Sequence, residues 1–486
     1  MTWAALAVLA LGVVAAARPA DALERLPAVL HVHSDITTGD FPLEDLARTA
    51  EQQGIEALLL AENYLVRIEY GVPPFRALTR VTRQERSVLD FGLERYLARV
   101  AEVRRQYPRV LLLPGVEVIP HYYWTGSPLA LTLHNTQKNL LVFGVTDAQA
   151  LASLPVTSNR HESIYTWQSA LEAAPGLLVI PGIVLLLTKR RRRRRIGRTI
   201  VIIRQRSWFS GVLVLGLGVL TVVRAWPFTV DRYPPWEDYG LAPHQALIDR
   251  VESLGGATVW SFPEATDAGE QWVGPVRVSW ETEPYADDLL KTFRYTALGG
   301  LYEQATRVVD PGGAWDRLLA QYAAGERRRP AWAIGESGFH GLTAGKRLGT
   351  MQTVFLTTKK SEAAVLDALK RGRLYALSRT LEVGLVLADF SIAGGEATAI
   401  SGETLGLPAG TPIEVRVAVD ATDAGSLPVR VTLLRNGEVA EAWTGRTPFR
   451  AVYRDAVERR SVVFRLDARA AASHRLLTSP IFVTGS

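Results

Sequence analysis

The sequence contains no cysteine in its 486 residues. Disulfide bonds, thiolate metal ligands and a cysteine nucleophile are therefore excluded, although export stays possible because an exported protein does not require disulfides. The sequence also contains no P-loop, no G-x-S-x-G elbow and no dinucleotide-binding fingerprint, so no motif indicates a nucleotide-binding protein or a serine hydrolase. Hydrophobic residues make up 48% and charged residues 21%, which is typical of a globular protein with some membrane content.

Acidic residues are missing from one segment, Lys189 to Arg206, which carries ten basic residues. Subtracting these ten charges from the formal net charge of +6 leaves −4 for the rest of the chain. A run of arginines is also found in nucleic-acid-binding patches. Its position between two apolar segments instead favours a topology signal with anionic-lipid contact. The expected partner is therefore the membrane, and no nucleic-acid partner is expected.

An uninterrupted apolar run at the N-terminus, Ala4 to Ala17, is followed by the small residues of "RPADA". Its length and the small residues after it predict a signal peptide or an N-terminal membrane anchor over residues 1–25. Signal peptides usually have a Lys or Arg before the apolar run, and none precedes this one. The alternative is a buried N-terminal helix.

Two further apolar runs, Ala173 to Leu187 and Trp208 to Val223, flank the basic segment. Each is shorter than the ~20 residues that cross a bilayer, and together they predict a helical hairpin over residues 173–226. By the positive-inside rule the arginine run lies in the cytoplasm, so the sequence before and after the hairpin lies on the opposite, extracytoplasmic side. A re-entrant hairpin would give the same result.

The soluble parts show two different patterns. Residues 26–172 and 227–384 alternate short β-rich runs with helical stretches, which predicts βα units around a parallel sheet in an α/β domain that the hairpin interrupts. Residues 385–486 contain period-two runs and an Asn436-Gly437 turn, which predict a small antiparallel β-sandwich resembling an immunoglobulin domain.

His31 and His33 end the apolar run of "LPAVLHVHSD". On a strand, residues i and i+2 point to the same face, so both imidazoles can reach one cation from the carboxyl end of the strand. Neutral imidazoles suit zinc, manganese or iron. The alternative is a strand with two partly exposed histidines and no metal.

The chain resembles the polymerase-and-histidinol-phosphatase (PHP) family from about residue 28 to 380, apart from the hairpin. The motifs that carry the resemblance occur in the family's order: "HVHSDITTGDFPLEDLARTAEQQGIEALLLAEN", "LPGVEV", "NLLVFGV", "VWSFPEA", "GESGFHG" and "LDALKRGRLYAL". The resemblance implies a distorted (β/α)7 TIM-like barrel whose mouth binds up to three metal ions and hydrolyses phosphate esters.

The resemblance assigns four metal-site residues and removes several others. His31 and His33 match the family's H-x-H pair, Glu117 matches the carboxylate that bridges two metals, and His340 matches the histidine of the closing D-x-H motif. The departures from the family pattern are Thr37, Thr38 and Gly39 for "SDG", Ala61, Glu62 and Asn63 for "TDH", Asn139 and Phe262 for two histidines, and Gly338 for an aspartate.

The remaining ligands are enough for one ion. His31, His33 and Glu117 supply two nitrogens and one oxygen, a set that holds a catalytic zinc with one position open to water. The expected cofactor is therefore one divalent ion at most, zinc or manganese. The residues that could substitute for lost ligands in space are Asp35, Asp40, Glu62 and His134.

Two functions follow, and both stay open. The first is a membrane-anchored phosphoesterase in which His340 is an outer ligand or phosphate partner. The second is a non-catalytic envelope protein that binds a phosphorylated small molecule or polymer. Three weaker candidates are the aromatic loop His121 to Leu129, which could shape a substrate pocket or simply pack, and Lys346 and Arg347, which could bind phosphate or form a solvated basic turn. The oligomeric state is left open.

Overall fold

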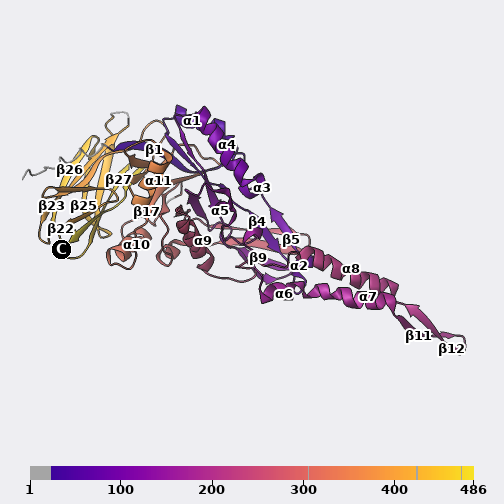
Figure 1. Ribbon diagram of the computed structural model, residues 1–486. Helices are drawn as coiled ribbons and strands as arrows, with labels where there is room; N and C mark the ends of the chain where they lie inside the picture. The colour runs from indigo at the N-terminus through magenta and orange to yellow at the C-terminus, as the bar shows by residue number, and fades with distance from the viewer. Residues whose placement is uncertain (1–22, 305, 423–424, 472) are drawn as a thin grey trace, which may run out of the picture.

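The computed structural model describes residues 23–304, 306–422, 425–471 and 473–486. It has an α/β region, a projecting helical arm and a strand-rich C-terminal region (Figure 1). The apolar run Ala4 to Ala17, predicted to be a signal peptide or anchor, lies outside the described residues. The first described strand, β1, begins at Glu24, inside the range 1–25 expected for that segment.

The α/β region is built on one series of hydrogen-bonded strands. In pairing order they are β1 (Glu24–Val32), β2 (Ala57–Leu60) continued by β3 (Glu62–Asn63), β6 (Leu111–Leu113) continued by β7 (Gly115–Val118), β10 (Leu140–Phe143), β13 (Ala257–Trp260), β16 (Ala297–Leu301) and β17 (Trp332–Phe339). Strand β17 also pairs in parallel with β1, so the pairing returns to its first strand.

The sheet is mixed, whereas the sequence pattern predicted a parallel one. Strand β10 is antiparallel to both β7 and β13, while the other pairs of the series are parallel. The chain travels from β7 to β10 through the hairpin of β8 (Tyr123–Ser127) and β9 (Ala130–His134) and not through a crossover helix. A parallel neighbour needs a long crossover, so this connection suits an antiparallel strand.

Helices cover the sheet through amphipathic faces. They are α1 (Leu43–Gln52), α3 (Val88–Phe91), α4 (Leu93–Gln106), α5 (Ala148–Ala152), α9 (Ala242–Ser253), α10 (Ala314–Ala323) and α11 (Glu362–Arg371), with short turns at η1 (Arg160–Glu162) and η3 (Ala286–Leu290). Helix α1 buries Leu43, Leu46, Ala47 and Ala50, a spacing of three and four residues that makes one apolar stripe. These side chains join one continuous core with the strands.

Short strands that the sequence did not predict extend the α/β region toward the arm. Strands β4 (Arg67–Tyr70) and β5 (Val81–Gln84) form a hairpin around α2 (Arg76–Thr79). Strands β14 (Asp267–Val273) and β15 (Val276–Thr282) join β9 and β8 in a separate sheet.

The arm projects away from the α/β region, on the side opposite the C-terminal strands (Figure 1). Its elements are α6 (Trp167–Ala173), η2 (Ala174–Leu178), α7 (Val179–Leu187), β11 (Lys189–Ile196), β12 (Thr199–Arg206) and α8 (Trp208–Ala225). Two helical stretches, Trp167–Leu187 and Trp208–Ala225, are long and apolar enough to cross a membrane by length and composition. The first begins before residue 173, where the hairpin was predicted to start, and the basic segment forms a β-hairpin that the sequence did not predict.

The two arm helices approach each other closely where glycine removes the side chain. A Cβ on Gly218 would collide with the backbone nitrogen of Val179, and one on Gly182 would lie 2.5 Å from the backbone nitrogen of Leu215. Small residues let helix backbones approach in this way inside a lipid bilayer, where apolar side chains gain nothing by leaving the lipid.

Antiparallel pairing dominates the C-terminal region, as its sequence pattern predicted. After β17, strands β18 (Met351–Thr357) and β19 (Leu374–Ser378) still belong to the α/β region, because β18 pairs with β1 and with β19. The strands of the C-terminal region are β20 (Leu385–Gly394), β21 (Ala397–Ile400), β22 (Thr404–Leu407), β23 (Pro412–Ala421), β24 (Pro428–Arg435), β25 (Glu438–Arg446), β26 (Phe449–Ala456), β27 (Val462–Ala470), β28 (His474–Thr478) and β29 (Ile481–Gly485). Asn436 and Gly437 turn β24 into β25 with φ values of 55° and 83°, as the hairpin signal predicted. Because β28 pairs with β19, this region is hydrogen-bonded directly to the α/β region.

Candidate metal centre

His31 and His33 reach the site through an irregularity at the end of β1. The pairing of β1 with both neighbours shifts register between Leu30 and Val32, and His31 has a φ of 65°. A non-glycine residue in this region is strained, and such strain is tolerated where surrounding contacts hold it. The amide of His33, just past the strand, donates to the carbonyl of Phe339 at 2.9 Å. The two histidines therefore converge through a bulge, which simple strand alternation did not include.

Glu117 on β7 completes a group of three possible ligands. His31 Nε2 lies 3.0 Å from His33 Nε2 and 3.3 Å from Glu117 Oε1, and His33 Nε2 lies 3.5 Å from Glu117 Oε2. A tetrahedral zinc with bonds of about 2.0–2.1 Å places its ligand atoms about 3.3 Å apart. The three side chains thus have the spacing that one tetrahedral ion requires. Within the described ranges, no other residue belongs to this group of metal-ligating side chains.

Glu336 on β17 supports this group, and the sequence analysis did not identify it. Its carboxylate Oε1 accepts a hydrogen bond from Nδ1 of His31 at 2.7 Å, and its side chain is fully buried. Ser261 Oγ and the Phe262 amide also donate to it, at 2.5 and 3.1 Å. A carboxylate behind a histidine fixes the ring so that Nε2 faces the metal and makes it a stronger ligand. Among the residues that the structure describes, His33 has no such partner, because its Nδ1 is buried without a hydrogen bond.

The charges of the group are strongly coupled. Burial by itself would raise the pKa of Glu117, but the charge and hydrogen bond of His31, with His33 and His340, lower it to about 2. Burial acts to lower the pKa of His31, but Glu117 and Glu336 together raise it to about 9. Burial holds the pKa of His33 well below its ordinary value. One proton therefore lies among these side chains at neutral pH, and a metal ion binding there would displace it.

His340 lies against the group but outside it. Its ring stacks on that of His33, with centroids 3.9 Å apart and planes 12° apart, and its Nδ1 is 3.0 Å from Thr38 Oγ1. Burial, and then the charge of His31, lower the pKa of His340, so the ring is neutral at pH 7. His340, the fourth predicted metal-site residue, therefore lies against the three candidate ligands but is not one of them.

Two departures from the PHP pattern fill one side of the site together. The ring of Phe262 stacks on His31 with centroids 5.2 Å apart. A Cβ on Gly338 would lie 2.7 Å from the Phe262 ring and 2.9 Å from Lys346 Nζ. An aspartate at 338 would therefore require both neighbours to move. A phenyl ring lies against His31 and an ammonium group lies over that ring, and neither group binds a metal ion.

Lys346 lies beside the site. The sequence had left open whether this residue binds phosphate or forms a solvated basic turn. Its ammonium donates to the carbonyl of Ser337 at 2.8 Å and lies 5.3 Å above the Phe262 ring. Arg347 next to it is exposed. Of the two basic residues, Lys346 therefore places its positive charge at the site.

Other polar residues orient the ligands and do not join them. The Asn139 amide donates to Glu117 Oε1 at 2.7 Å and fixes that carboxylate. The possible substitutes, Asp35, Asp40, Glu62 and His134, all lie outside the ligand group. Asp40 accepts a hydrogen bond from Thr343 at 2.5 Å, and His134 lies 3.0 Å from Glu281.

Glu62 shapes the loop after His33. Its buried carboxylate accepts from the amide and hydroxyl of Ser34, at 2.8 and 2.5 Å, and from the hydroxyl of Thr37. Burial raises the pKa of Glu62 to about 7, although these hydrogen bonds act against the change. The unfolded chain releases this proton near the ordinary pKa of 4.5. The free energy of unfolding therefore falls as the pH rises from about 4.5 through 7, by about 3 kcal/mol from this group.

The variant Glu62→Gln should match the wild type in stability at pH 5 and exceed it at pH 8 by up to about 3 kcal/mol, because glutamine can make similar hydrogen bonds without a charge. Urea unfolding at a series of pH values measures the difference. The exposed Glu94→Gln serves as the control, and its difference from wild type should stay constant with pH. A constant difference for Glu62→Gln as well would contradict the assignment.

The aromatic loop His121 to Leu129 lies away from the ligand group. His121 is buried against Tyr239 and Tyr123, and Tyr123–Ser127 forms strand β8. Trp124 lines a separate cavity at the base of the arm. The loop therefore does not shape a pocket for the metal group.

No protein-family model and no curated protein matches the chain. A solved two-domain protein from Bacteroides vulgatus containing a predicted PHP-like metal-dependent phosphoesterase is 11% identical with a TM-score of 0.35, over 92% of this chain and 91% of that one. A candidate metal-dependent phosphoesterase from Bifidobacterium adolescentis is 14% identical with a TM-score of 0.29, over 68% and 92%. An amidohydrolase from Chromobacterium violaceum, with sulfate and no metal, is 12% identical with a TM-score of 0.25, over 64% and 87%.

Proposed function

We propose that the protein is a membrane-anchored phosphoesterase of the PHP type that works with one divalent ion, zinc or manganese. The observation that carries the proposal is the spacing of the ligand atoms of His31, His33 and Glu117, which matches the edges of a tetrahedral coordination shell. The carboxylate of Glu336 behind His31 adds the outer support typical of such sites.

The proposed architecture is a distorted (β/α)7 barrel with an inserted arm. The strand pairing that runs from β1 to β17 and back to β1 supports the barrel. In this division residues 26–172 and 227–384 form the barrel, residues 173–226 the membrane hairpin and residues 385–486 a β-sandwich. The ligands then lie at the carboxyl ends of strands, where barrel enzymes place their sites.

The protein's own residues suit a phosphate ester. A divalent ion at this site would polarise a phosphoryl oxygen or activate water. The Lys346 ammonium, beside the Phe262 ring, is positioned to bind a second phosphate oxygen where the PHP pattern would place a further ion. His340 is neutral at pH 7, so it can hydrogen-bond the phosphate or accept a proton.

A second function, a non-catalytic envelope binding protein, is favoured by a specific observation. Phe262 and Gly338 supply no ligand at two positions where the PHP pattern has a histidine and an aspartate. Phosphoryl transfer depends mainly on positioned positive charge, so losing two ions should cost much of the rate. In this alternative the site binds a phosphorylated small molecule or an envelope polymer without cleaving it.

The two functions are separated by metal analysis and hydrolysis assays on the full-length protein in detergent. We expect one zinc or manganese ion per chain, with cleavage of p-nitrophenyl phosphate or bis-p-nitrophenyl phosphate that a chelator removes and added metal restores. Stoichiometric metal without cleavage of either ester would support the binding protein. A folded chain that binds neither metal would overturn the metal centre.

Sidedness has its own test. The basic β-hairpin turns at Gly197 and is the tip of the arm in Figure 1. We propose that this tip lies in the cytoplasm and the remaining domains lie outside it, on the positive-inside rule. A reporter inserted at the turn should give a cytoplasmic signal, and a periplasmic or external signal would reverse the proposed orientation.

Lys346→Met should lower kcat/KM for the phosphoester by roughly 10- to 100-fold, since a hydrogen bond to a charged group contributes about 1.5–3 kcal/mol. The metal content should stay unchanged. Arg347→Met removes the neighbouring exposed charge and should leave kcat/KM within about 2-fold, since exposed charges contribute little. Equal effects of both substitutions on kcat/KM would mean that only the general positive potential matters.

A further inference from the structure

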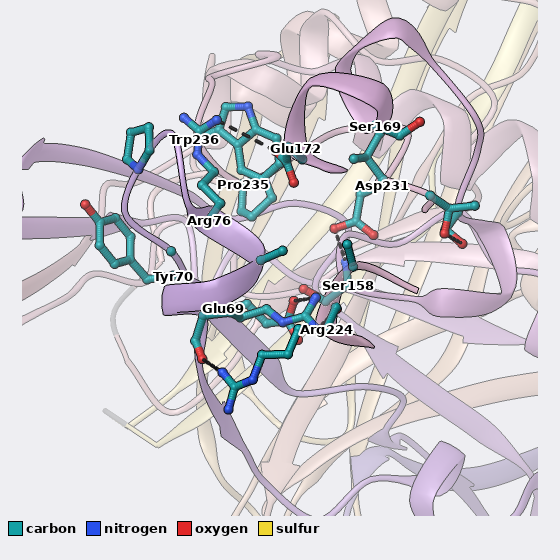
Figure 2. Close-up of a pocket in the computed structure, with 18 of the residues that line it drawn as sticks. Glu69, Tyr70, Arg76, Ser158, Ser169, Glu172, Arg224, Asp231, Pro235 and Trp236 are labelled. Carbon is teal, nitrogen blue, oxygen red and sulfur yellow. Dashed lines mark hydrogen bonds and ion pairs between the residues drawn. The ribbon is translucent and has the colours of Figure 1, made fainter. Parts of the chain in front are cut away.

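A cavity of about 300 Å³, drawn in Figure 2, lies where the arm meets the α/β region, and its lining contains none of His31, His33 and Glu117. We name it the arm-base cavity; its lining includes Arg76, Arg80, Arg160, Arg224, Trp124 and Trp236. Helix α2, the start of the first arm helix and the end of α8 all contribute to it. Its volume suits a headgroup-sized ligand.

The end of α8 is held at this cavity by hydrogen bonds from arginine side chains to backbone carbonyls. The Arg224 guanidinium donates to the carbonyls of Leu78 and Arg80, at 3.3 and 3.4 Å, and Arg80 donates to the Arg224 carbonyl at 3.1 Å. These bonds leave the positive charge of Arg224 without a carboxylate partner in the described part of the chain. The wall of the cavity is therefore both fixed and charged.

Positive charge in the cavity is incompletely neutralised. Arg76 and Arg80 form only long ion pairs, at 3.7 Å to Glu172 and 3.8 Å to Glu69. Across the described ranges, the Arg160 guanidinium has neither a hydrogen bond nor an ion pair. Burial, and then the charges of Arg67 and Arg80, lower the pKa of Arg160. An anion entering the cavity would relieve this repulsion between guanidinium groups.

The acidic side chains of the cavity neutralise only part of this positive charge. Glu69 is held mainly by Arg67, at 2.5 Å. Asp231 accepts a hydrogen bond from the Ser158 amide at 3.0 Å, as Figure 2 shows, and burial raises its pKa to about 6. The Trp236 Nε1 donor is buried and has no hydrogen-bond partner in the described part of the chain, and Figure 2 shows this side chain beside Arg76 and Glu172. An incoming anion would find one free donor in addition to the guanidinium groups.

The rim of the cavity is aromatic and lies at the end of an apolar helix. Trp226 and Phe228 follow α8 directly and line the cavity, and Trp226 is 72% exposed. Trp side chains are enriched at the boundary between lipid and water. With the arm inserted as in the proposed function, the cavity would open at that boundary.

We propose that the arm-base cavity binds the phosphate headgroup of an anionic membrane lipid; this rests on the membrane insertion of the arm and not on the metal centre. Guanidinium groups bind phosphate oxygens with paired hydrogen bonds. The apolar rim holds the first carbons of the acyl chains. The same chemistry would recognise a soluble phosphate monoester, and the experiment separates the two.

The test measures binding of dihexanoyl phosphatidylglycerol to the full-length protein in non-ionic detergent by calorimetry, with a chelator present so that the metal centre plays no part. We expect binding at least 10-fold tighter than that of glycerol phosphate, which lacks the acyl chains. We also expect Arg160→Gln to weaken lipid binding at least 10-fold, since it removes a charged hydrogen bond. Among the described residues Arg160 forms no hydrogen bond or ion pair through its side chain, so the melting temperature should not change.

The matched control is Arg105→Gln, which removes an exposed arginine on α4 and should leave the affinity for the lipid unchanged. Arg76→Gln is the second cavity variant and should also weaken binding. Unchanged affinity in both cavity variants would overturn the site. Glycerol phosphate binding as tightly as the lipid would overturn the membrane source of the ligand.

Discussion

Replacing His33 with alanine should remove the bound metal from the protein and abolish metal-dependent phosphoester cleavage. The substitution deletes one of three ligands, and the remaining His31 and Glu117 cannot hold a divalent ion in a closed site. Loss of an outer partner of a ligand typically costs 10–100-fold in metal affinity, so loss of a ligand itself should cost more than about 100-fold. Equilibrium dialysis with zinc or manganese, followed by elemental analysis, measures the change.

Two further variants make this result specific. His161→Ala removes an exposed histidine of η1 outside the ligand group and should leave metal content and cleavage unchanged. Glu336→Gln keeps a hydrogen-bond acceptor for His31 but removes its charge, so it should weaken metal binding by an intermediate amount. If His33→Ala retained the metal with wild-type affinity, the ion would lie elsewhere and the proposed centre would be wrong.

The sequence predicted the three candidate ligands from a local H-x-H signal and from the order of the PHP motifs. His31 and His33 follow an apolar strand, and Glu117 lies in a similar strand-end position in the order seen in PHP proteins. Glu336 has no local signal, because it lies inside a fully buried strand and its role depends on which strand pairs with β1. The bulge at His31 could not be predicted for the same reason, since a bulge is defined only relative to the neighbouring strands.

The direction of strand β10 and the β-hairpin of the arm also could not be predicted from the sequence. The antiparallel β10 is as apolar as β2, which pairs in parallel, so its pattern predicts a strand and not the direction of that strand. The arginine-rich segment pairs Lys189–Ile196 with Thr199–Arg206 around Gly197. A strand of like charges lacks the alternation of apolar and polar residues by which strands are recognised. By contrast, the apolar runs and the Asn436-Gly437 turn have strong local signals and were found.

Arg465→Met should lower the free energy of unfolding by about 3–5 kcal/mol, the largest stability effect expected outside the metal centre. Arg465 Nε and its terminal nitrogen donate to the two carboxylate oxygens of Asp316, each at 2.6 Å, and both side chains are almost fully buried. The substitution would leave the Asp316 carboxylate buried with no charged partner. Urea unfolding, followed by circular dichroism, measures the change.

The size of this effect follows from burial and not from the ion pair as such. Arg450→Met breaks an exposed ion pair with Asp420 in a different sheet from that of Arg465. This substitution should lower the free energy of unfolding by less than about 1 kcal/mol. The double variant Arg465→Met/Asp316→Leu removes both buried charges and should recover most of the lost stability. Arg465 on β27 donates to Asp316 in α10 and to the Val309 carbonyl in the segment before it, so the single variant would loosen the C-terminal strands from both. A double variant no more stable than the single one would show that packing around Trp315, and not the unpaired carboxylate, sets the loss.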